Sequence, residues 1–340
     1  MNIPYRTRLK LQRYGTVALF VVMVLSLIWF CWVVWLARYV VYTRDEGAVL
    51  DFNLSETLPA GQEAQPPESD LDIEIYYNEG EGKVDLSTEL TQLKGYYVLG
   101  SALASDPAAV WEQIQALPAG TPVMLDMKTI YGTFYYSTST GRPLNSNADI
   151  RGVDALINKL KDSGYYTIAR VPALRDREYG LNNTNEGLPV SGGYLWMDED
   201  GCYWLNPARK AIVNYLTDIA TELRALGFDE VVFEDFYFPE TDRIIFDGNK
   251  QETLEKTAQT IVTACATETF AVSFVSDGTW KEPEGRSRVY REDISDAIAL
   301  MELSNNLTME NPKTRLVLIT NNLDTRFEDY GILRPIELAH

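Results

Sequence analysis

A helix followed directly by a strand is written most clearly in residues 207–236, PARKAIVNYLTDIATELRALGFDEVVFEDF. Asn206 is a candidate N-cap and Pro207 fits the first helical position. Apolar residues then recur at helical spacing and form one stripe: Ile212, Val213, Leu216, Ile219, Ala220, Leu223 and Leu226. Gly227 fits the position just past the helix, where a left-handed backbone is common. Residues 229–236 follow as a β-branched and aromatic run that predicts a buried strand.

The same unit recurs on both sides of this segment. Further helices are expected at 107–117, 154–163 and 251–266, and further strands at 95–100, 122–127, 165–171, 270–275, 297–301 and 315–320. Alternating strands and helices predict an α/β fold with a parallel sheet. Residues 93–340 match the roughly 250 residues of a (β/α)8 TIM-type barrel. Seven strands are evident. Residues 321–340 show no clear eighth strand, so we expect a barrel that is incomplete at its C-terminal end or closed by an irregular segment.

Composition restricts the chemistry. The 340 residues include 30 basic and 49 acidic side chains, for a formal charge of −19, which argues against nucleic-acid binding. The single histidine is His340, so histidine-ligated zinc and Ser-His-Asp triads are nearly excluded. No metal or cofactor is expected. Acid–base chemistry must come from carboxylates, Tyr or Lys. Cys202 and Cys265 could pair outside the cytoplasm, although a buried free thiol is the expectation for Cys265.

Residues 14–37 carry no charge and predict a single membrane-spanning helix, roughly 36 Å long. Four basic residues precede them (Arg6, Arg8, Lys10 and Arg13), which places the tail 1–13 in the cytoplasm and the rest outside. A cleaved signal peptide is the alternative. Residues 45–92 are acidic and predict a mostly disordered linker. The sequence therefore predicts a barrel, residues 93–340, tethered to the outer face of a cell membrane.

Polar side chains follow the predicted strands, where TIM barrels carry their working residues. In chain order they are Asp126 and Lys128, then Arg170, Arg175 and Asp176, then Glu234 and Asp235, then Ser276 and Asp277, then Glu302, and finally Asn321 and Asn322. Converging carboxylates suit glycoside hydrolysis, which needs one carboxylic acid and one carboxylate nucleophile or base. Since Glu234 and Asp235 are adjacent in a strand, only one of them should point into the barrel mouth.

Aromatic residues fall in the same loops and could stack on sugar faces: Tyr131, Tyr135, Tyr136, Tyr194, Trp196, Trp204, Tyr237 and Trp280.

Four stretches resemble motifs of a bacterial domain-of-unknown-function family, the putative glycoside hydrolases. They are GFDEVVFEDFYFP at 227–239, YTIARVPALRD at 166–176, the Trp196…Trp204-Leu205-Asn206-Pro207 pattern, and VMLDMKTIYGTFYY at 123–136. The resemblance covers residues 94–280 and implies a TIM barrel distantly similar to the α-amylase type. It also implies that Asp126, Lys128, Arg170, Asp176 and Glu234 are site positions.

The chain departs from the family pattern at four positions. Glu234 stands where the family has Asp, Tyr237 where it has Arg, Thr129 where it has Asp, and Asn206 where it has Asp. The longer Glu234 side chain moves its carboxyl group by one methylene, and reacting geometry is sensitive to shifts of about 1 Å. These departures leave both a changed substrate and a loss of activity open.

We therefore expect a membrane-anchored glycoside hydrolase acting on a cell-wall or environmental glycan. Glu234 would be nucleophile or general base, Asp176 or Asp277 the acid, and Asp126 a further catalytic carboxylate. The substrate would be held by Lys128, Arg170, Trp196, Trp204, Tyr237, Asp277 and Glu302. The alternatives are a non-catalytic barrel that binds glycan or a surface protein, and a scaffold in a surface complex. The sequence indicates no particular protein partner.

Overall fold

The computed structural model describes residues 89–139, 141–307 and 309–336, together with 23, 29, 40–43 and 47–50. The chain divides into two compact units, Met1–Glu81 and Gly82–His340. In the first unit, β1 (Val40–Thr43) pairs antiparallel with β2 (Gly47–Leu50). The tail 1–13, nearly all of the predicted membrane segment 14–37 and most of the linker 45–92 lie outside the described residues. Among the helices that are described, none has the length and apolar character needed to cross a bilayer.

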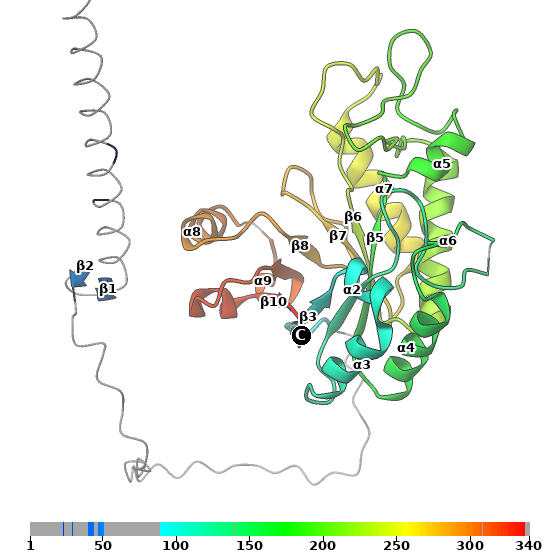
Figure 1. Cartoon of the computed structure of the whole chain (residues 1–340). Coiled ribbons are helices and arrows are strands. Elements are labelled where there is room, and N and C mark those ends of the chain that lie inside the picture. The colour runs from blue at the N-terminus through cyan, green and yellow to red at the C-terminus, as the bar shows by residue number, and fades with distance from the viewer. Residues whose placement is uncertain are drawn as a thin grey trace, which may run out of the picture. The chain divides into compact units, whose positions relative to one another are not determined.

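The second unit is a closed barrel of parallel strands (Figure 1). Its strands, in order around the barrel, are β3 (Lys94–Val98), β4 (Val123–Asp126), β5 (Thr167–Pro172), β6 (Glu230–Glu234), β7 (Ala271–Val275), β8 (Val289–Arg291), β9 (Leu316–Ile319) and β10 (Gly331–Pro335). This arrangement confirms the predicted TIM-type barrel. Parallel strands place all their carboxyl ends at one mouth, where Asp126 and Glu234 end β4 and β6.

The expectation of an incomplete barrel was wrong. Strand β10 pairs with β9 on one side and with β3 on the other, and the Ile332 N–H donates to the Leu93 carbonyl at 2.7 Å. Local sequence hides this strand, because only Ile332 and Leu333 are apolar before Arg334 and Pro335. Pairing on both edges, rather than intrinsic propensity, stabilises it.

The predicted strand 297–301 was also wrong. These residues form the first half of α8 (Ala297–Asn306), because the Asp296 carboxylate accepts hydrogen bonds from the Ile298 and Ala299 N–H groups and caps the helix. The sixth barrel strand is β8, which has only three residues. Glu302 therefore lies in a helix and not at a strand end.

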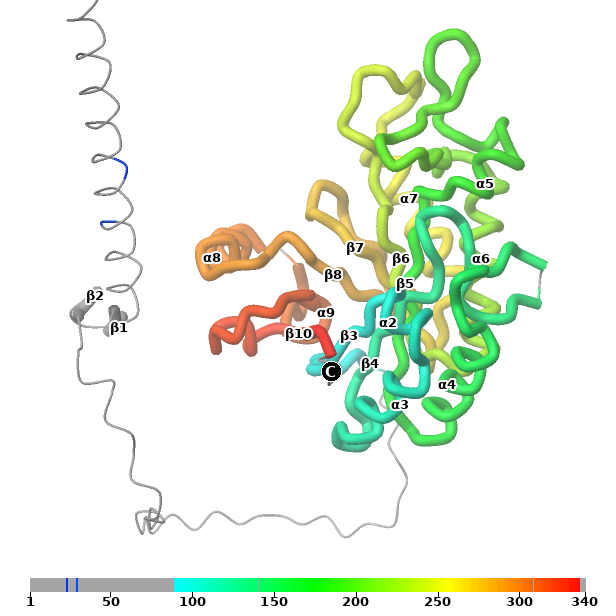
Figure 2. The backbone as a smooth tube through the Cα atoms, in the orientation of Figure 1, coloured from blue at the N-terminus to red at the C-terminus, as the bar shows by residue number. Residues whose placement is uncertain are grey.

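The helices along the outside of the barrel are α2 (Gly100–Ser105), α3 (Pro107–Gln115), α4 (Ile150–Asp162), α5 (Arg177–Asn182), α6 (Lys210–Leu226) and α7 (Lys250–Cys265), followed by α8, α9 (Pro312–Arg315) and the short 3-10 helix η1 (Thr325–Asp329). Helix α6 begins later than expected, and Asn206 instead accepts from the Ala208 N–H in the preceding turn. Gly227 ends α6 with φ 100°, as predicted. Figure 2 shows α4, α6 and α7 gathered on one side of the barrel, and α8 on the other.

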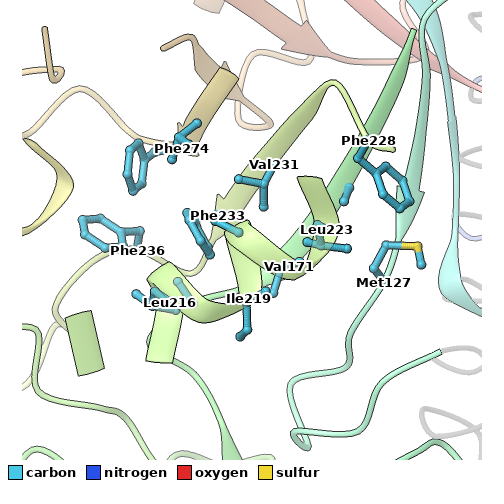
Figure 3. Close-up of a cluster of buried hydrophobic side chains, with 14 of the residues drawn as sticks. Met127, Val171, Leu216, Ile219, Leu223, Phe228, Val231, Phe233, Phe236 and Phe274 are labelled. Atoms are coloured by element: carbon cyan, nitrogen blue, oxygen red, sulfur yellow. The ribbon is translucent and has the colours of Figure 1, made fainter. Parts of the chain in front are cut away.

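Apolar packing between α6 and the strands holds this side together (Figure 3). Leu216, Ile219 and Leu223 are fully buried, as are Val231 and Phe233 of β6. The barrel interior holds a second cluster that includes Met124, Ile168, Val232, Tyr290, Val317 and Leu333. The interior is therefore a packed core, so any ligand must bind at the mouth. Cys202 and Cys265 are both buried and free.

Candidate active site

Arg170 organises the carboxylates at the mouth. Its Nε lies 2.6 Å from Oδ1 of Asp126 and 3.1 Å from Oε2 of Glu234, and its Nη1 lies 2.7 Å from Oε1 of Glu292. These residues come from the ends of β4, β5 and β6 and from the residue after β8. The barrel register sets Asp126 beside Arg170, and Pro172 beside Glu234. One half-buried guanidinium group thus gathers three acids from strands that are distant in sequence.

Glu234 is the carboxyl group whose protonation is most altered among them. Burial raises its pKa to about 7, and the negative charges of Asp235, Glu292 and Asp126 act in the same direction. The Arg170 guanidinium opposes this rise. Its side chain keeps 25% of its surface exposed, so a ligand can still reach it. A carboxyl group with this pKa can both donate and accept a proton near neutral pH.

Asp235 also belongs to the site, although only one of these adjacent residues was expected to point into the mouth. Strand β6 ends at Glu234, and Asp235 adopts φ 52°, which breaks the strand alternation. Both side chains consequently line the same cavity. Burial raises the pKa of Asp235 to about 6 against the opposing charges of Arg175 and Lys128. A non-glycine residue in the left-handed region costs about 1–3 kcal/mol and is often found at functional sites.

Two cavities meet at Glu234. The larger, about 600 Å³, has among its lining residues Asp235, Tyr237, Asp277, Trp280 and Glu292. The smaller, about 260 Å³, is lined by Ser101, Asp126, Tyr135 and Arg170, among others. Glu234 lines both. A ligand spanning the two cavities would therefore pass its middle over the Glu234 carboxyl group.

The aromatic residues divide into exposed and supporting ones. Tyr237 is 43% exposed and lines the larger cavity, with its ring centroid 4.8 Å from that of Trp204. Trp204 is buried and donates from Nε1 to Asp198 at 3.1 Å. Trp204 therefore supports Tyr237 from behind. Trp196 is half-buried against the core and lines neither cavity at Glu234.

Asp176 does not reach the cavities, contrary to its expected role as general acid. Its side chain is fully buried and its carboxylate pairs with Lys128 Nζ at 2.7 Å. It also accepts from the Tyr215 hydroxyl at 2.7 Å and from the Tyr179 N–H at 2.8 Å, which caps α5. Lys128 donates in addition to the Pro172 carbonyl. Tyr215 of α6 contacts both members of the pair. Asp176 lines neither cavity at Glu234, whereas Lys128 is among the lining residues of the smaller one.

Asp277 and Glu302 line one further cavity. Asp277 is exposed and lines both the 600 Å³ cavity and a neighbouring one of about 390 Å³. Glu302, in α8, lines only the 390 Å³ cavity of these two. Sequence reasoning missed Glu292, because β8 is too short to show a periodic pattern. Asp235 was among the polar residues expected at the strand ends, but the sequence did not show that it joins Glu234, because the left-handed turn has no signature in the side chains around it.

The two carboxyl groups that contact Arg170 Nε lie close together. Oδ1 of Asp126 and Oε2 of Glu234 are 2.6 and 3.1 Å from this nitrogen, so these two oxygens are at most about 6 Å apart. The carboxyl groups of a retaining glycosidase pair are about 5–5.5 Å apart. The described residues contain no group of three His, Cys, Asp or Glu side chains able to hold a metal ion. The site therefore offers paired carboxyl groups, one of which, Glu234, has its pKa raised to about 7.

An eight-stranded parallel barrel with paired carboxyl groups at its mouth defines the TIM-barrel class to which many glycosidases belong. A family model described as "Putative glycosyl hydrolase domain" matches residues 100–274, and the chain belongs to this family. That match contains Asp126, Arg170, Asp176 and Glu234, and confirms the resemblance noted in the sequence. A comparison with curated proteins finds no match.

Two solved α-galactosidase structures share the fold. The galactosidase domain of an α-galactosidase–sucrose kinase is 11% identical over 74% of this chain and 40% of its own, with a TM-score of 0.52. A family 36 α-galactosidase from Geobacillus stearothermophilus, in complex with raffinose, is 12% identical over 72% and 39%, with a TM-score of 0.51. A hypothetical protein from Ruminiclostridium thermocellum is 20% identical over 52% and 96%, with a TM-score of 0.45. The chain spans about two fifths of the length of the two galactosidase chains, and these likenesses concern the fold alone.

Proposed function

We propose that the barrel hydrolyses glycosidic bonds, with Glu234 as the general acid. The observation that carries this proposal is the position of Glu234, whose pKa is raised to about 7, where two cavities meet and within about 6 Å of the Asp126 carboxylate. Sequence reasoning favours Glu234 as nucleophile or base. Its raised pKa supports the acid role instead, because a nucleophile has to be ionised.

In the proposed reaction the Glu234 proton moves to the glycosidic oxygen as the bond from that oxygen to the sugar carbon breaks. Asp126, oriented by Arg170 and by the Gly100 N–H at 2.8 Å, supplies the second carboxylate. Water adds its hydroxyl group to the sugar carbon, and its remaining proton restores Glu234. A cell-wall or environmental glycan is the proposed substrate, as the sequence indicated.

A matched pair of variants tests this proposal. The full chain, its Glu234→Gln variant and its Glu268→Gln variant would be incubated with a panel of cell-wall and storage polysaccharides, and new reducing ends measured. Glu268 is exposed and lines neither cavity at Glu234, so it controls for the same chemical change elsewhere. We expect release by the parent and by Glu268→Gln, and a loss of about 100-fold or more in Glu234→Gln.

Release retained in Glu234→Gln would remove Glu234 from the mechanism. Glycan binding by the parent chain without any release would favour the non-catalytic barrel, whose motivation is the substitution of family positions at Thr129, Asn206 and Tyr237.

We also propose that residues 14–37 anchor the protein in a cell membrane, with the barrel outside. The support is the uncharged run with four basic residues before it. Protease added to intact cells should then remove the barrel. Protection of the barrel until the cells are broken would contradict this topology.

A further inference from the structure

The two cavities at Glu234 differ in chemistry. Polar and charged side chains make up part of the lining of the 260 Å³ pocket, among them Ser101, Asp126, Lys128 and Arg170. Asp126 is held there by the first N–H of α2, at Gly100. A side chain at position 100 would place its Cβ 2.8 Å from the Tyr135 ring, so the pocket wall depends on glycine at this point. Such a pocket suits a hydroxyl-rich group about the size of one sugar ring.

The 600 Å³ cavity has an aromatic wall. Trp280 is 4% exposed, and its ring centroid lies 5.5 Å from that of Phe236 and 5.7 Å from that of Phe274. Tyr237 also belongs to this lining, and its ring packs against that of Trp204. Rings fixed in this way offer flat apolar faces at little entropic cost.

The same cavity is strongly acidic. Its lining includes Glu234, Asp235, Glu240, Asp277, Glu292 and Asp293. Lys250 is the one basic residue in that lining, as far as the described residues show, and its ammonium group lies 5.7 Å from the centroid of the Phe238 ring. Arg170 and Arg291 neutralise Glu292 and Asp293, but Glu240 and Asp277 are exposed at the surface. The field in the cavity therefore repels anions.

We propose that Glu234 separates two subsites, a polar pocket for the sugar whose bond is cleaved and an acidic, aromatic-walled cleft for the leaving group, which is uncharged or cationic. The assignment of a cleaved sugar and a leaving group rests on the proposed hydrolase function. The preference for uncharged or cationic ligands rests on the lining of the two cavities alone. Anionic leaving groups, such as uronate or phosphate-bearing units, are disfavoured because the acidic side chains of this lining outnumber its one basic side chain, Lys250.

Aryl glycosides with one constant sugar test the cleft. The aryl ring carries a 4-carboxylate, no charge or a 4-aminomethyl group, and galactose, glucose and N-acetylglucosamine series are each made. Binding to the full-chain Glu234→Gln variant is measured by saturation-transfer NMR on the aryl protons. We expect the neutral and cationic members to bind about tenfold more tightly than the carboxylate, with the gap narrowing as salt rises.

Charge reversal at the rim separates local from global effects. In the Glu234→Gln background, Glu240→Lys should abolish or reverse the difference in affinity between the carboxylate and aminomethyl compounds. Glu268→Lys makes the same change in net charge away from the cavity, so it should leave the difference in affinity unchanged. Equal binding of all three members, a preference for the carboxylate, binding of none, or equal effects of the two lysine variants would overturn the proposal.

The polar pocket is tested on α2. Ser101→Phe fills the pocket, whereas Ser105→Phe adds the same ring to an exposed position of that helix outside it. Methyl glycosides, which lack the aryl group, should lose binding in Ser101→Phe alone, and equal losses in both would overturn the assignment. Charge-selective binding without sugar release from any glycan would retain the subsites and refute hydrolysis. Sugar release without charge-selective binding would support hydrolysis and refute the assignment of the two subsites.

Discussion

Glu234 owes its chemistry to its neighbours rather than to its own side chain. Burial and three nearby acids favour its neutral form, and Arg170 favours its charged form. The balance leaves the pKa at about 7, which is where a general acid is useful at neutral pH. Arg170 is thus both the residue that assembles the carboxylates and the one that limits how far the Glu234 pKa rises.

The pH dependence of activity should report this balance. Since the acid form of Glu234 is lost above its pKa, kcat/KM should fall about tenfold per pH unit above a midpoint near 7. Replacing Arg170 by Gln removes the charge that lowers this pKa, so the midpoint should move to higher pH. The measurement is kcat/KM against pH for both proteins. A midpoint near the ordinary glutamate value, or one that Arg170→Gln leaves in place, would count against the acid role.

Stability should also depend on Glu234. Its pKa is higher in the folded chain than the ordinary value of 4.5, so the folded state binds more protons between about pH 4.5 and 7. The free energy of unfolding should therefore fall as pH rises through this window. Asp235, whose pKa is raised from 3.8 to about 6, contributes a further decrease in the free energy of unfolding between about pH 3.8 and 6. In Glu234→Gln the slope should be smaller, as urea denaturation at several pH values would show. An unchanged slope, matching that of Glu268→Gln, would refute the shift.

At the scale of elements, local signals succeeded where a segment's own residues determine its structure. The α6–β6 unit was predicted because its apolar stripe, its terminal glycine and its β-branched strand all agree. The prediction for 297–301 was wrong, because its apolar run is typical of a strand, whereas the N-cap at Asp296 stabilises a helix there. Glycine at the end of α6 is a local requirement of the same kind, since φ is 100° there.

Gly227→Ala should reduce the free energy of unfolding by about 1–2 kcal/mol, because a Cβ is strained in the left-handed region. The added Cβ would also lie 2.7 Å from Cδ of Lys161, a flexible side chain that can move. Gly164→Ala makes a matched comparison, since Gly164 has φ 69° with nothing within 4 Å of the added Cβ. Urea denaturation should give a loss in both, equal or slightly larger at Gly227. An unchanged free energy of unfolding in Gly227→Ala would show that the backbone at this turn adopts another conformation without cost.

At the scale of the whole molecule, a buried ionic network joins the barrel strands at their amino ends. The Arg288 guanidinium pairs with Glu230, which opens β6, and both side chains are almost wholly buried. Tyr290 and Tyr166 donate to the same carboxylate at 3.0 and 2.9 Å. Arg288 also donates to the Thr91 and Thr314 carbonyls, just before β3 and β9. Segments more than 200 residues apart in the sequence, near Thr91 and Thr314, therefore meet at one side chain.

Arg288→Met should cost about 3–5 kcal/mol of unfolding free energy, because it leaves the Glu230 charge buried without its partner. The double variant Arg288→Met, Glu230→Met should recover much of this loss, since no unpaired charge then remains. Urea denaturation followed by circular dichroism measures both. A single variant as stable as the parent would mean that water or another group compensates Glu230.

The sequence by itself determined the barrel class, most of its strands and helices, the acidic character and the positions of Asp126, Arg170 and Glu234. These follow from periodicity, glycine placement and motif spacing, which are local properties. The tertiary structure alone decided that β10 closes the barrel, that Asp176 and Lys128 bury each other, and that Asp235 and Glu292 join Glu234. Each of these depends on which distant strands become neighbours, and neither burial nor the charges that surround a carboxylate exist until the chain has closed on itself.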